Sequence, residues 1–325
     1  MSRVGAGGAP ALRTPAALGM WARPWAWLTA PGSPVRLALL RALVGGYLTA
    51  WSLARLPAHV GHADQSPVRW QPVGVLAWAG TPLPDAAVVA LAVAMPVLAV
   101  LFTLGWRFPL VAPFAALATL VLATLDSSWG QVFHTENLLV LHVGILAMAP
   151  AADALGLRSA APPRARPPVG ERYGWPVRLA AVVVVLAYVL AGLAKLRASG
   201  LAWVDGEVLR NLVAHDNLRK ALLGDTYSTI GTRLVRHGWL FAPMAVASLA
   251  VELGAPLALT GGRRRTVWVV GAWLFHVGVL ALMAISFPYQ LTGVAFAPFL
   301  PLERLAARVA RRLPGSPVER LVPPT

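Results

Sequence analysis

The sequence has no cysteine and little charge, with only 13% of its 325 residues being Asp, Glu, Lys or Arg. The lack of cysteine excludes a disulfide framework, a thiolate nucleophile and a cysteine-ligated metal site. A soluble domain is about a quarter charged, so the low charge argues against an ordinary soluble domain. Together with 57% hydrophobic residues and long uncharged runs, it predicts a protein that crosses a membrane several times.

Sequence motifs for familiar cofactors are also missing. There is no P-loop, no glycine-rich dinucleotide fingerprint and no HExxH metalloprotease motif. The seven histidines are too scattered along the chain to predict a metal site. We therefore predict a protein that binds neither a metal ion nor a nucleotide.

The apolar runs predict an all-α fold, a polytopic membrane helix bundle with about eight transmembrane spans. The fifth span lies within residues 175–206. The other seven are predicted at residues 37–56, 86–105, 108–125, 134–149, 239–260, 267–285 and 291–302. The last run is short and contains proline, so we expect it to be broken or to cross only half of the bilayer.

The chain divides into two tails and one membrane domain. Residues 1–35 are predicted to be a cytoplasmic tail with an interfacial tryptophan segment (Trp21, Trp25, Trp27), and residues 303–325 a basic cytoplasmic tail. Residues 36–302 form the predicted transmembrane domain, with proline-rich loops at 57–85 and 150–176. Residues 197–238 are predicted to lie at the outer face and to form one or two short amphipathic helices, around 206–215 and 218–223.

The net charge of +15 is explained by membrane orientation rather than by nucleic acid. With both termini in the cytoplasm, most of the 28 Lys and Arg residues fall on the cytoplasmic side, as the positive-inside rule requires. This excess can face anionic lipid. We expect membrane lipid as a partner and no nucleic acid.

One lysine stands out because it lies near the end of the fifth apolar run. An ammonium group in hydrocarbon costs roughly 2.5–3.5 kcal/mol on insertion scales, so Lys195 should have a function or bend towards water. Tyr188 and Gly192 lie on the same helical face as Lys195. A neutral amine there could act as a general base. Spacing alone leaves both the catalytic and the snorkelling interpretation open.

The other ionisable residues at membrane depth should face the interior of the bundle. His134 opens the fourth run, where it could orient a substrate or shuttle a proton, or simply bond to the backbone. His276 follows Phe275 and could equally be a buried histidine hydrogen-bonded to another span. We expect Arg41 and Glu252 to form a buried structural ion pair.

The sequence around Lys195 resembles the signature of a known family. Tyr188, Gly192 and Lys195-Leu196, followed by Trp203-Val204-Asp205-Gly206, are similar to the phrase found in the vitamin K-dependent γ-carboxylase-related membrane domain. This domain is also called the HTTM, or horizontally transferred transmembrane, domain. The resemblance covers roughly residues 36–302 and includes Arg41, His134, Glu252 and the Phe275-His276 pair.

The resemblance implies roles for several of these residues. In the carboxylases a lysine acts as a base toward a hydroxyl of reduced vitamin K, and oxygen then attacks the hydroquinone anion while the quinone ends as an epoxide. Lys195 matches that lysine, His134 matches a histidine implicated in carboxylation, and His276 matches a further family histidine. Reduced vitamin K or menaquinone, with O2, is the implied co-substrate.

The sequence also departs from the carboxylases. Ala194 stands where they have the first lysine of a pair, and Phe133 where they have an asparagine. No equivalent of their large lumenal domain follows residue 302. We therefore do not expect processive glutamate carboxylation.

Two kinds of function stay open. The first is a membrane enzyme, either a quinol epoxidase-like oxidoreductase or a carboxylase-like lyase. Its catalytic residues would be Lys195, His134 and His276, and its substrate-binding residues Tyr188, Trp203, Asp205 and Phe133. The second is a non-enzymatic lipid- or quinone-binding protein or a subunit of a larger complex, with a homo-oligomer or a protein partner also open. The Ala-, Arg- and Pro-rich composition favours the inner membrane of a bacterium.

Overall fold

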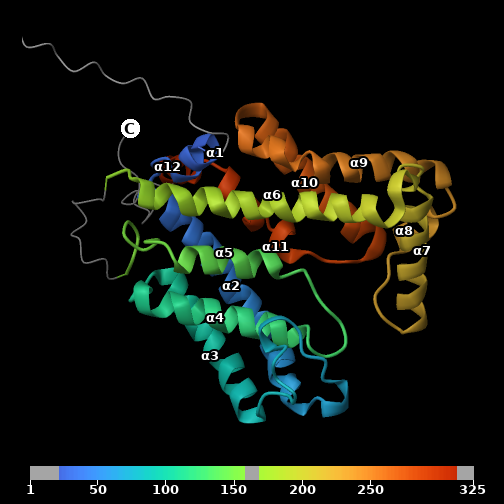
Figure 1. Ribbon diagram of the computed structural model, residues 1–325, viewed down its shortest axis with the longest axis horizontal. Helices are drawn as coiled ribbons and strands as arrows, with labels where there is room; N and C mark the ends of the chain where they lie inside the picture. The colour runs from blue at the N-terminus through green and yellow to red at the C-terminus, as the bar shows by residue number, and fades with distance from the viewer. Residues whose placement is uncertain (1–21, 158–167, 313–325) are drawn as a thin grey trace, which may run out of the picture.

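The computed structural model describes residues 22–157 and 168–312, and its regular elements are helices apart from one isolated β-bridge between Gly32 and Gly170. The all-α prediction is therefore confirmed (Figure 1). The α-helices are α1 (Ala22–Thr29), α2 (Pro34–Gly61), α3 (Asp85–Leu104), α4 (Phe108–Asp126), α5 (Asn137–Ala147), α6 (Glu171–Ser199), α7 (Glu207–Leu222), α8 (Thr229–Leu234), α9 (Phe241–Leu253), α10 (Gly262–Met283), α11 (Pro288–Leu291) and α12 (Leu302–Arg312). Short 3₁₀ helices link them, including η1 (His62–Asp64), η4 (Gly200–Trp203), η6 (Ala255–Thr260) and η7 (Val294–Phe299).

In the described part of the chain, five helices are long and apolar enough to cross a membrane, namely α2, α3, α4, α6 and α10. The chain is thus a multi-pass membrane protein. The three remaining predicted spans are shorter or broken. The span predicted at 134–149 contains α5, which has only 11 residues. The span at 239–260 is divided into α9 and η6, and the last apolar run contains only the short helices α11 and η7. Pro256, Pro288 and Pro298 lie in these broken regions, and a proline has no backbone N–H to donate to a continuous helix.

The helix α2 runs through the middle of the bundle and supplies much of its core. Its fully buried side chains recur at the spacing of one helical face, at Leu37, Leu40, Val44 and Leu48. This face packs against α3, α5, α6 and η7. A loop was predicted to begin at Pro57, and this prediction is wrong because α2 continues through that proline to Gly61. Pro57 is exposed, and the buried His59 holds the last turn against α4.

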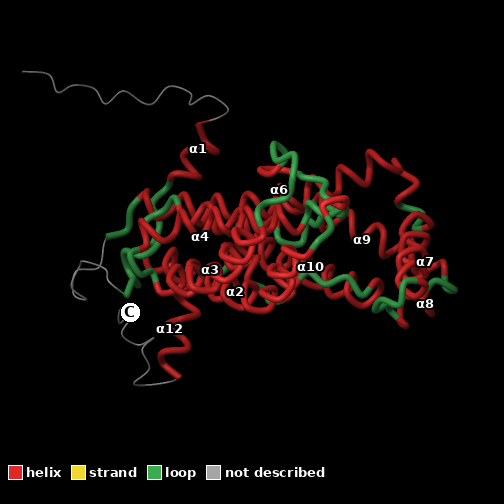
Figure 2. Tube along the Cα trace, turned by 90° about the horizontal axis from the view of Figure 1, so that it is seen from below, coloured by secondary structure: helices red, strands yellow, loops and turns green. Residues whose placement is uncertain are grey.

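The bundle has two distinct ends (Figures 1 and 2). We call the end that holds α7 and α8 the α7 end, and the end that holds α1 and α12 the α1 end. At the α7 end, α7 closes the C-terminus of α10, whose last carbonyls have no partner within the helix. Lys220 Nζ donates to Met283 O over 2.6 Å, and Asn217 Nδ2 donates to Leu282 O over 2.8 Å.

The segment 197–238 differs in detail from its prediction. One or two short helices were expected around 206–215 and 218–223. The two regions belong to a single helix, α7, from Glu207 to Leu222, and α8 follows it. The backbone at Gly206 has φ +85°, and a Cβ there would lie 2.3 Å from the carbonyl carbon of Phe241. Glycine at this turn therefore lets α7 start directly against α9.

Candidate ligand-binding site

A cavity of about 750 Å³ lies between α5, α6, α10 and α11, a volume typical of ligand sites. Its apolar walls come from Leu138 and Leu141 of α5, and from Leu186 and Leu190 of α6. Leu141, Leu186 and Leu190 are 48%, 50% and 62% exposed. Because α6 is long and apolar enough to span a bilayer, the exposed Leu186 and Leu190 are suited to contact with acyl chains.

The polar side of the same cavity is formed by residues from five separate segments. These residues are His134 and Asn137 around the start of α5, together with Tyr188, Lys195, Glu252, His276 and Gln290. The three residues predicted to be catalytic, Lys195, His134 and His276, thus line one cavity, as does Tyr188. Phe133, Trp203 and Asp205 are not among its lining residues.

Lys195 forms an ion pair with Glu252, which is almost completely buried. The contact depends on a close approach of α6 and α9 at Gly192, one turn before Lys195. A Cβ at Gly192 would lie 2.8 Å from Leu253 Cδ2 and 3.0 Å from Glu252 Cβ. The glycine therefore brings the carboxylate within reach of the amine. Lys195 Nζ also lies 5.3 Å from the centre of the Trp203 ring, which adds a cation–π contact.

The predicted ion pair between Arg41 and Glu252 is not formed, and the structure corrects it. Arg41 is 2% exposed and its Nη2 donates to Leu155 O over 2.5 Å. Its guanidinium lies over the Phe108 ring and against Gly105, at the turn that joins α3 to α4. Glu252 is instead on α9, where its neighbour across the packed helices is Lys195.

His276 is held in the cavity by Tyr188, whose hydroxyl lies 2.8 Å from His276 Nε2. The ring of Phe287 lies 4.9 Å from the His276 ring and 5.5 Å from the His134 ring, and so stands between the two imidazoles. His134 is exposed in the segment that precedes α5, which begins at Asn137. The Phe287 ring thus packs against both imidazoles.

Three buried polar atoms of the residues that line this cavity have no hydrogen-bond partner within the described chain. They are Glu252 Oε2, His276 Nδ1 and Gln290 Oε1. Buried polar atoms are nearly always hydrogen-bonded in native proteins, so three such atoms at one cavity require an explanation. The two oxygens can only accept and need a hydroxyl donor, whereas His276 Nδ1 can donate to an oxygen when it carries the ring proton. Each atom is covered by the protein, so a side chain must turn before a ligand can reach it.

A second cavity of about 850 Å³ adjoins the first at the α7 end. His134, Ile285 and Phe287 line both cavities and so form the wall between them. Charged side chains of α7 line the second cavity, namely Asp216, Arg219 and Lys220. The predicted residue Phe133 belongs to this second cavity.

Trp203 and Asp205 support the site from outside. Trp203 Nε1 donates to Ala245 O over 3.2 Å and to Ser248 Oγ over 3.1 Å, which fixes η4 against α9. Asp205 Oδ1 accepts from the backbone N–H of Glu207 over 2.9 Å at the start of α7. Trp203 thus lies beside Lys195 and Asp205 at the start of α7, and neither lines the first cavity.

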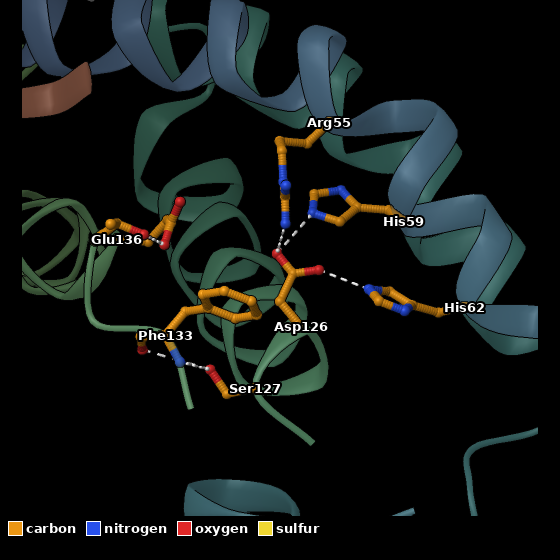
Figure 3. A network of polar contacts seen from close by, with 8 residues as sticks. Arg55, His59, His62, Asp126, Ser127, Phe133 and Glu136 are labelled. Atoms are coloured by element: carbon orange, nitrogen blue, oxygen red, sulfur yellow. Dashed lines mark hydrogen bonds and ion pairs between the residues drawn. The ribbon is translucent and has the colours of Figure 1, made fainter. Parts of the chain in front are cut away.

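A polar network around Asp126 was not foreseen from the sequence (Figure 3). The Asp126 carboxylate accepts from Arg55 Nη2 at 2.9 Å and lies 3.4 Å from His59 Nε2 and 2.6 Å from His62 Nε2. All three partners approach from the end of α2 and from η1, and Asp126 is the last residue of α4. The signal was the spacing of positions 55, 59 and 62, which share one helical face once α2 is extended through Pro57.

The residues that the structure describes contain no group of three or more His, Asp or Glu side chains arranged to hold a metal ion. In the Asp126 network the two histidines point at the carboxylate instead of at a shared empty position (Figure 3).

Comparison with known proteins adds one result to this geometry. No curated protein and no solved structure matches the chain significantly. A sequence model of the HTTM domain, however, matches residues 30–300, which include both cavities and all the long helices. The chain belongs to the HTTM family of membrane proteins.

Proposed function

We propose that the cavity between α5, α6, α10 and α11 binds a lipophilic quinol, such as reduced menaquinone or vitamin K, and that the Lys195–Glu252 pair accepts a proton from its hydroxyl. The observation that carries this proposal is the group of polar residues from separate segments, among them Lys195, Glu252 and His276, at one side of a cavity whose other walls are exposed leucines. A quinol has the matching shape, with oxygens on a ring and an apolar tail.

Lys195 and Glu252 are best treated as one proton acceptor. The amine and the carboxylate together share one proton, which rests either on the amine or on the carboxylate, and the pair can therefore accept one more. Taking a proton from a quinol hydroxyl leaves the pair with one positive charge beside the new quinol anion. The attraction between these charges is strong in a site with little water. Lys195 acts as the base when the shared proton rests on Glu252, because an ammonium group cannot accept a proton. In the ion-paired form the Glu252 carboxylate is the acceptor.

His276 and Gln290 would orient the ring. If the Tyr188 hydroxyl donates to His276 Nε2, Nδ1 carries the ring proton and can donate to a quinol oxygen. Gln290 Oε1 can accept from the opposite hydroxyl. By analogy with the carboxylases, O2 would then oxidise the anion, with one oxygen atom ending in the quinone epoxide and the other leaving as water, so that quinol and O2 give epoxide and H2O.

The test is reconstitution into nanodiscs with reduced menaquinone and oxygen, followed by mass spectrometry for the epoxide. We expect epoxide from the wild type and at least a tenfold loss in Lys195→Met and Glu252→Gln. Arg197→Met is the matched control, because Arg197 lies on the same helix, is exposed and does not line the cavity. No product from the wild type, or equal product from Lys195→Met, would remove the catalytic proposal.

A second candidate is a quinone- or lipid-binding protein without catalysis. It is favoured by the pairing of Lys195 with Glu252, which neutralises the charge of the lysine without any ligand. In that case a quinone would raise the unfolding temperature of the wild type and of the Lys195→Met/Glu252→Gln double variant equally, and no epoxide would form.

A further inference from the structure

A second kind of site lies at the α1 end, away from the quinol cavity. A small pocket of about 260 Å³ is lined by three arginines from three helices, Arg36 of α2, Arg178 of α6 and Arg265 of α10. Pro298 and Phe299 of η7 form another wall. Three guanidinium groups around so small a volume need a reason, because like charges repel one another.

The arginines are held by backbone carbonyls. Arg36 Nη2 donates to Leu300 O over 2.7 Å, and Arg265 Nη1 donates to Phe299 O over 3.2 Å. Arg178 donates to Pro31 O over 3.2 Å, in the turn that follows α1. Neutral carbonyls fix the orientation of a guanidinium group but do not cancel its charge.

The positive charge at this pocket is largely uncompensated. Within the described chain, the acidic side chain that approaches these arginines is Glu303, whose carboxylate lies 3.8 Å from Arg36 Nε. Arg36 Nε itself is buried without a hydrogen-bond partner. Arg178 and Arg265 both lie close enough to Arg36 to repel its charge. The pocket is therefore suited to an anion.

An apolar groove of about 650 Å³ continues from the arginine pocket. It is lined by Trp25 and Leu28 of α1, and by Leu179 and Val182 of α6. Trp27 and Leu259 line both the groove and the pocket, so the two spaces adjoin. Arg178 lies over the Trp27 ring at 5.9 Å and links them. Tryptophan is the residue favoured at the boundary between lipid and water.

We propose that this pair of spaces is a binding site for one anionic phospholipid. The phosphate diester of the head group lies among Arg36, Arg178 and Arg265, since guanidinium groups match phosphate geometry with paired hydrogen bonds. An acyl chain lies in the groove beneath α1. The lipid thereby joins α1 to α6 and α10. The positive charge of the three arginines favours an anionic lipid over a zwitterionic one. The apolar groove favours a lipid over free phosphate, because free phosphate has no acyl chain to fill it.

The experiment uses full-length protein, stripped of lipid in a neutral detergent, and native mass spectrometry with a parallel unfolding-temperature measurement. The probes are long-chain phosphatidylglycerol, long-chain phosphatidylcholine, short-chain phosphatidylglycerol and inorganic phosphate. We expect long-chain phosphatidylglycerol to bind and to stabilise the protein, with at least tenfold weaker binding of each of the other three. Binding should weaken as salt is raised.

Arg265→Gln and Arg264→Gln form a matched pair, because they remove the same charge one residue apart and Arg264 does not line the pocket. We expect Arg265→Gln to weaken phosphatidylglycerol binding at least tenfold and Arg264→Gln less than twofold. Should Arg265→Gln fail to fold, Trp25→Ala at the exposed rim of the groove should weaken the long-chain lipid several-fold and leave the short-chain lipid unchanged.

The outcomes separate the sources of the phosphate. Equal affinity for inorganic phosphate and long-chain phosphatidylglycerol would overturn the lipid assignment. Equal affinity for phosphatidylcholine and phosphatidylglycerol, with no difference between the two arginine variants, would overturn the anion site itself. Neither result bears on the quinol cavity, which lies on other residues.

Discussion

Two buried carboxylates in this protein have opposite surroundings. Asp126 is 6% exposed and Glu252 is 2% exposed, and each joins helices that are far apart in sequence. The Asp126 carboxylate has three partners, Arg55, His59 and His62, and neither of its oxygens is left unsatisfied. Glu252 has Lys195 alone, and its second oxygen is bare.

The two carboxylates therefore differ in how fully they are paired. The Asp126 network also contains buried atoms without a partner, namely Arg55 Nε, His59 Nδ1 and His62 Nδ1, and Arg55 lines the second cavity. Asp126 lines neither of the two cavities described above, and its partners fasten the end of α2 to the end of α4. Glu252 lines the first cavity, and its ion pair with Lys195 offsets only part of the free-energy cost of removing the carboxylate from water. A buried acceptor without a partner lowers stability, so packing elsewhere must sustain it until a ligand binds.

The largest effect is expected from Asp126→Ala. It leaves Arg55 and two histidines without their acceptor, so we expect a loss of about 3 kcal/mol in the free energy of unfolding. Thermal and denaturant unfolding in detergent would measure it. Asp64→Ala, an exposed aspartate in η1, is the control and should change stability by less than about 0.5 kcal/mol. Equal stability of the two variants would mean that the Asp126 network contributes nothing.

The next effect concerns the Lys195–Glu252 pair. We expect Lys195→Met and Glu252→Gln each to lower stability by about 1–3 kcal/mol, since each leaves a buried or half-buried partner unpaired. The double variant should recover most of that loss, because no charge is left alone. Quinol affinity, measured by tryptophan quenching, should stay at least tenfold reduced in the double variant. Additive losses would show that the two residues do not interact.

A smaller and opposite pattern is expected for Gln290→Leu. The substitution removes an unpartnered buried oxygen, so stability should stay constant or rise by about 1 kcal/mol. Quinol affinity should nevertheless fall about five-fold, because a hydrogen bond to the ring is lost. Unfolding and quinol titration of the same sample measure both quantities. A drop in stability with unchanged affinity would make Gln290 a structural residue like Asp126.

The smallest effect is expected from Asp205→Ala. Losing the hydrogen bond at the start of α7 should cost about 0.5–1 kcal/mol of stability. Quinol affinity should not change, since Asp205 lies outside the cavity. A substantial loss of affinity would restore the sequence-based interpretation of Asp205 as a substrate contact.

The positions of the long helices were readable from the chain because their ends are marked locally. The run predicted at 108–125 is α4, Phe108–Asp126, and the run at 86–105 is α3, Asp85–Leu104. Apolar residues fill both, and Gly105 and the polar stretch after Leu125 stop them. The broken segments were harder to place, because a hydropathy pattern does not reveal where a proline divides a run into short helices.

For Lys195 the sequence predicted an unusual buried amine but not the residue that pairs with it. Its place in an apolar run and its spacing from Tyr188 identified it as unusual, and the cost of burying an ammonium required a partner. The sequence offered Glu252 as an acid but gave no means of choosing between Lys195 and Arg41 as its cation. That choice depends on which helices touch and how each is rotated.

The amino-acid order by itself determined the helical class, the main membrane-crossing segments and the small set of polar residues that must avoid lipid. It could do so because hydrophobic burial and backbone hydrogen bonding act on residues close together in the chain. Tertiary packing alone decided that Glu252 meets Lys195, that Asp126 gathers two histidines and an arginine, and that three arginines converge at the α1 end. Each of these contacts joins segments far apart in sequence, and small residues such as Gly192 set how closely the helices approach.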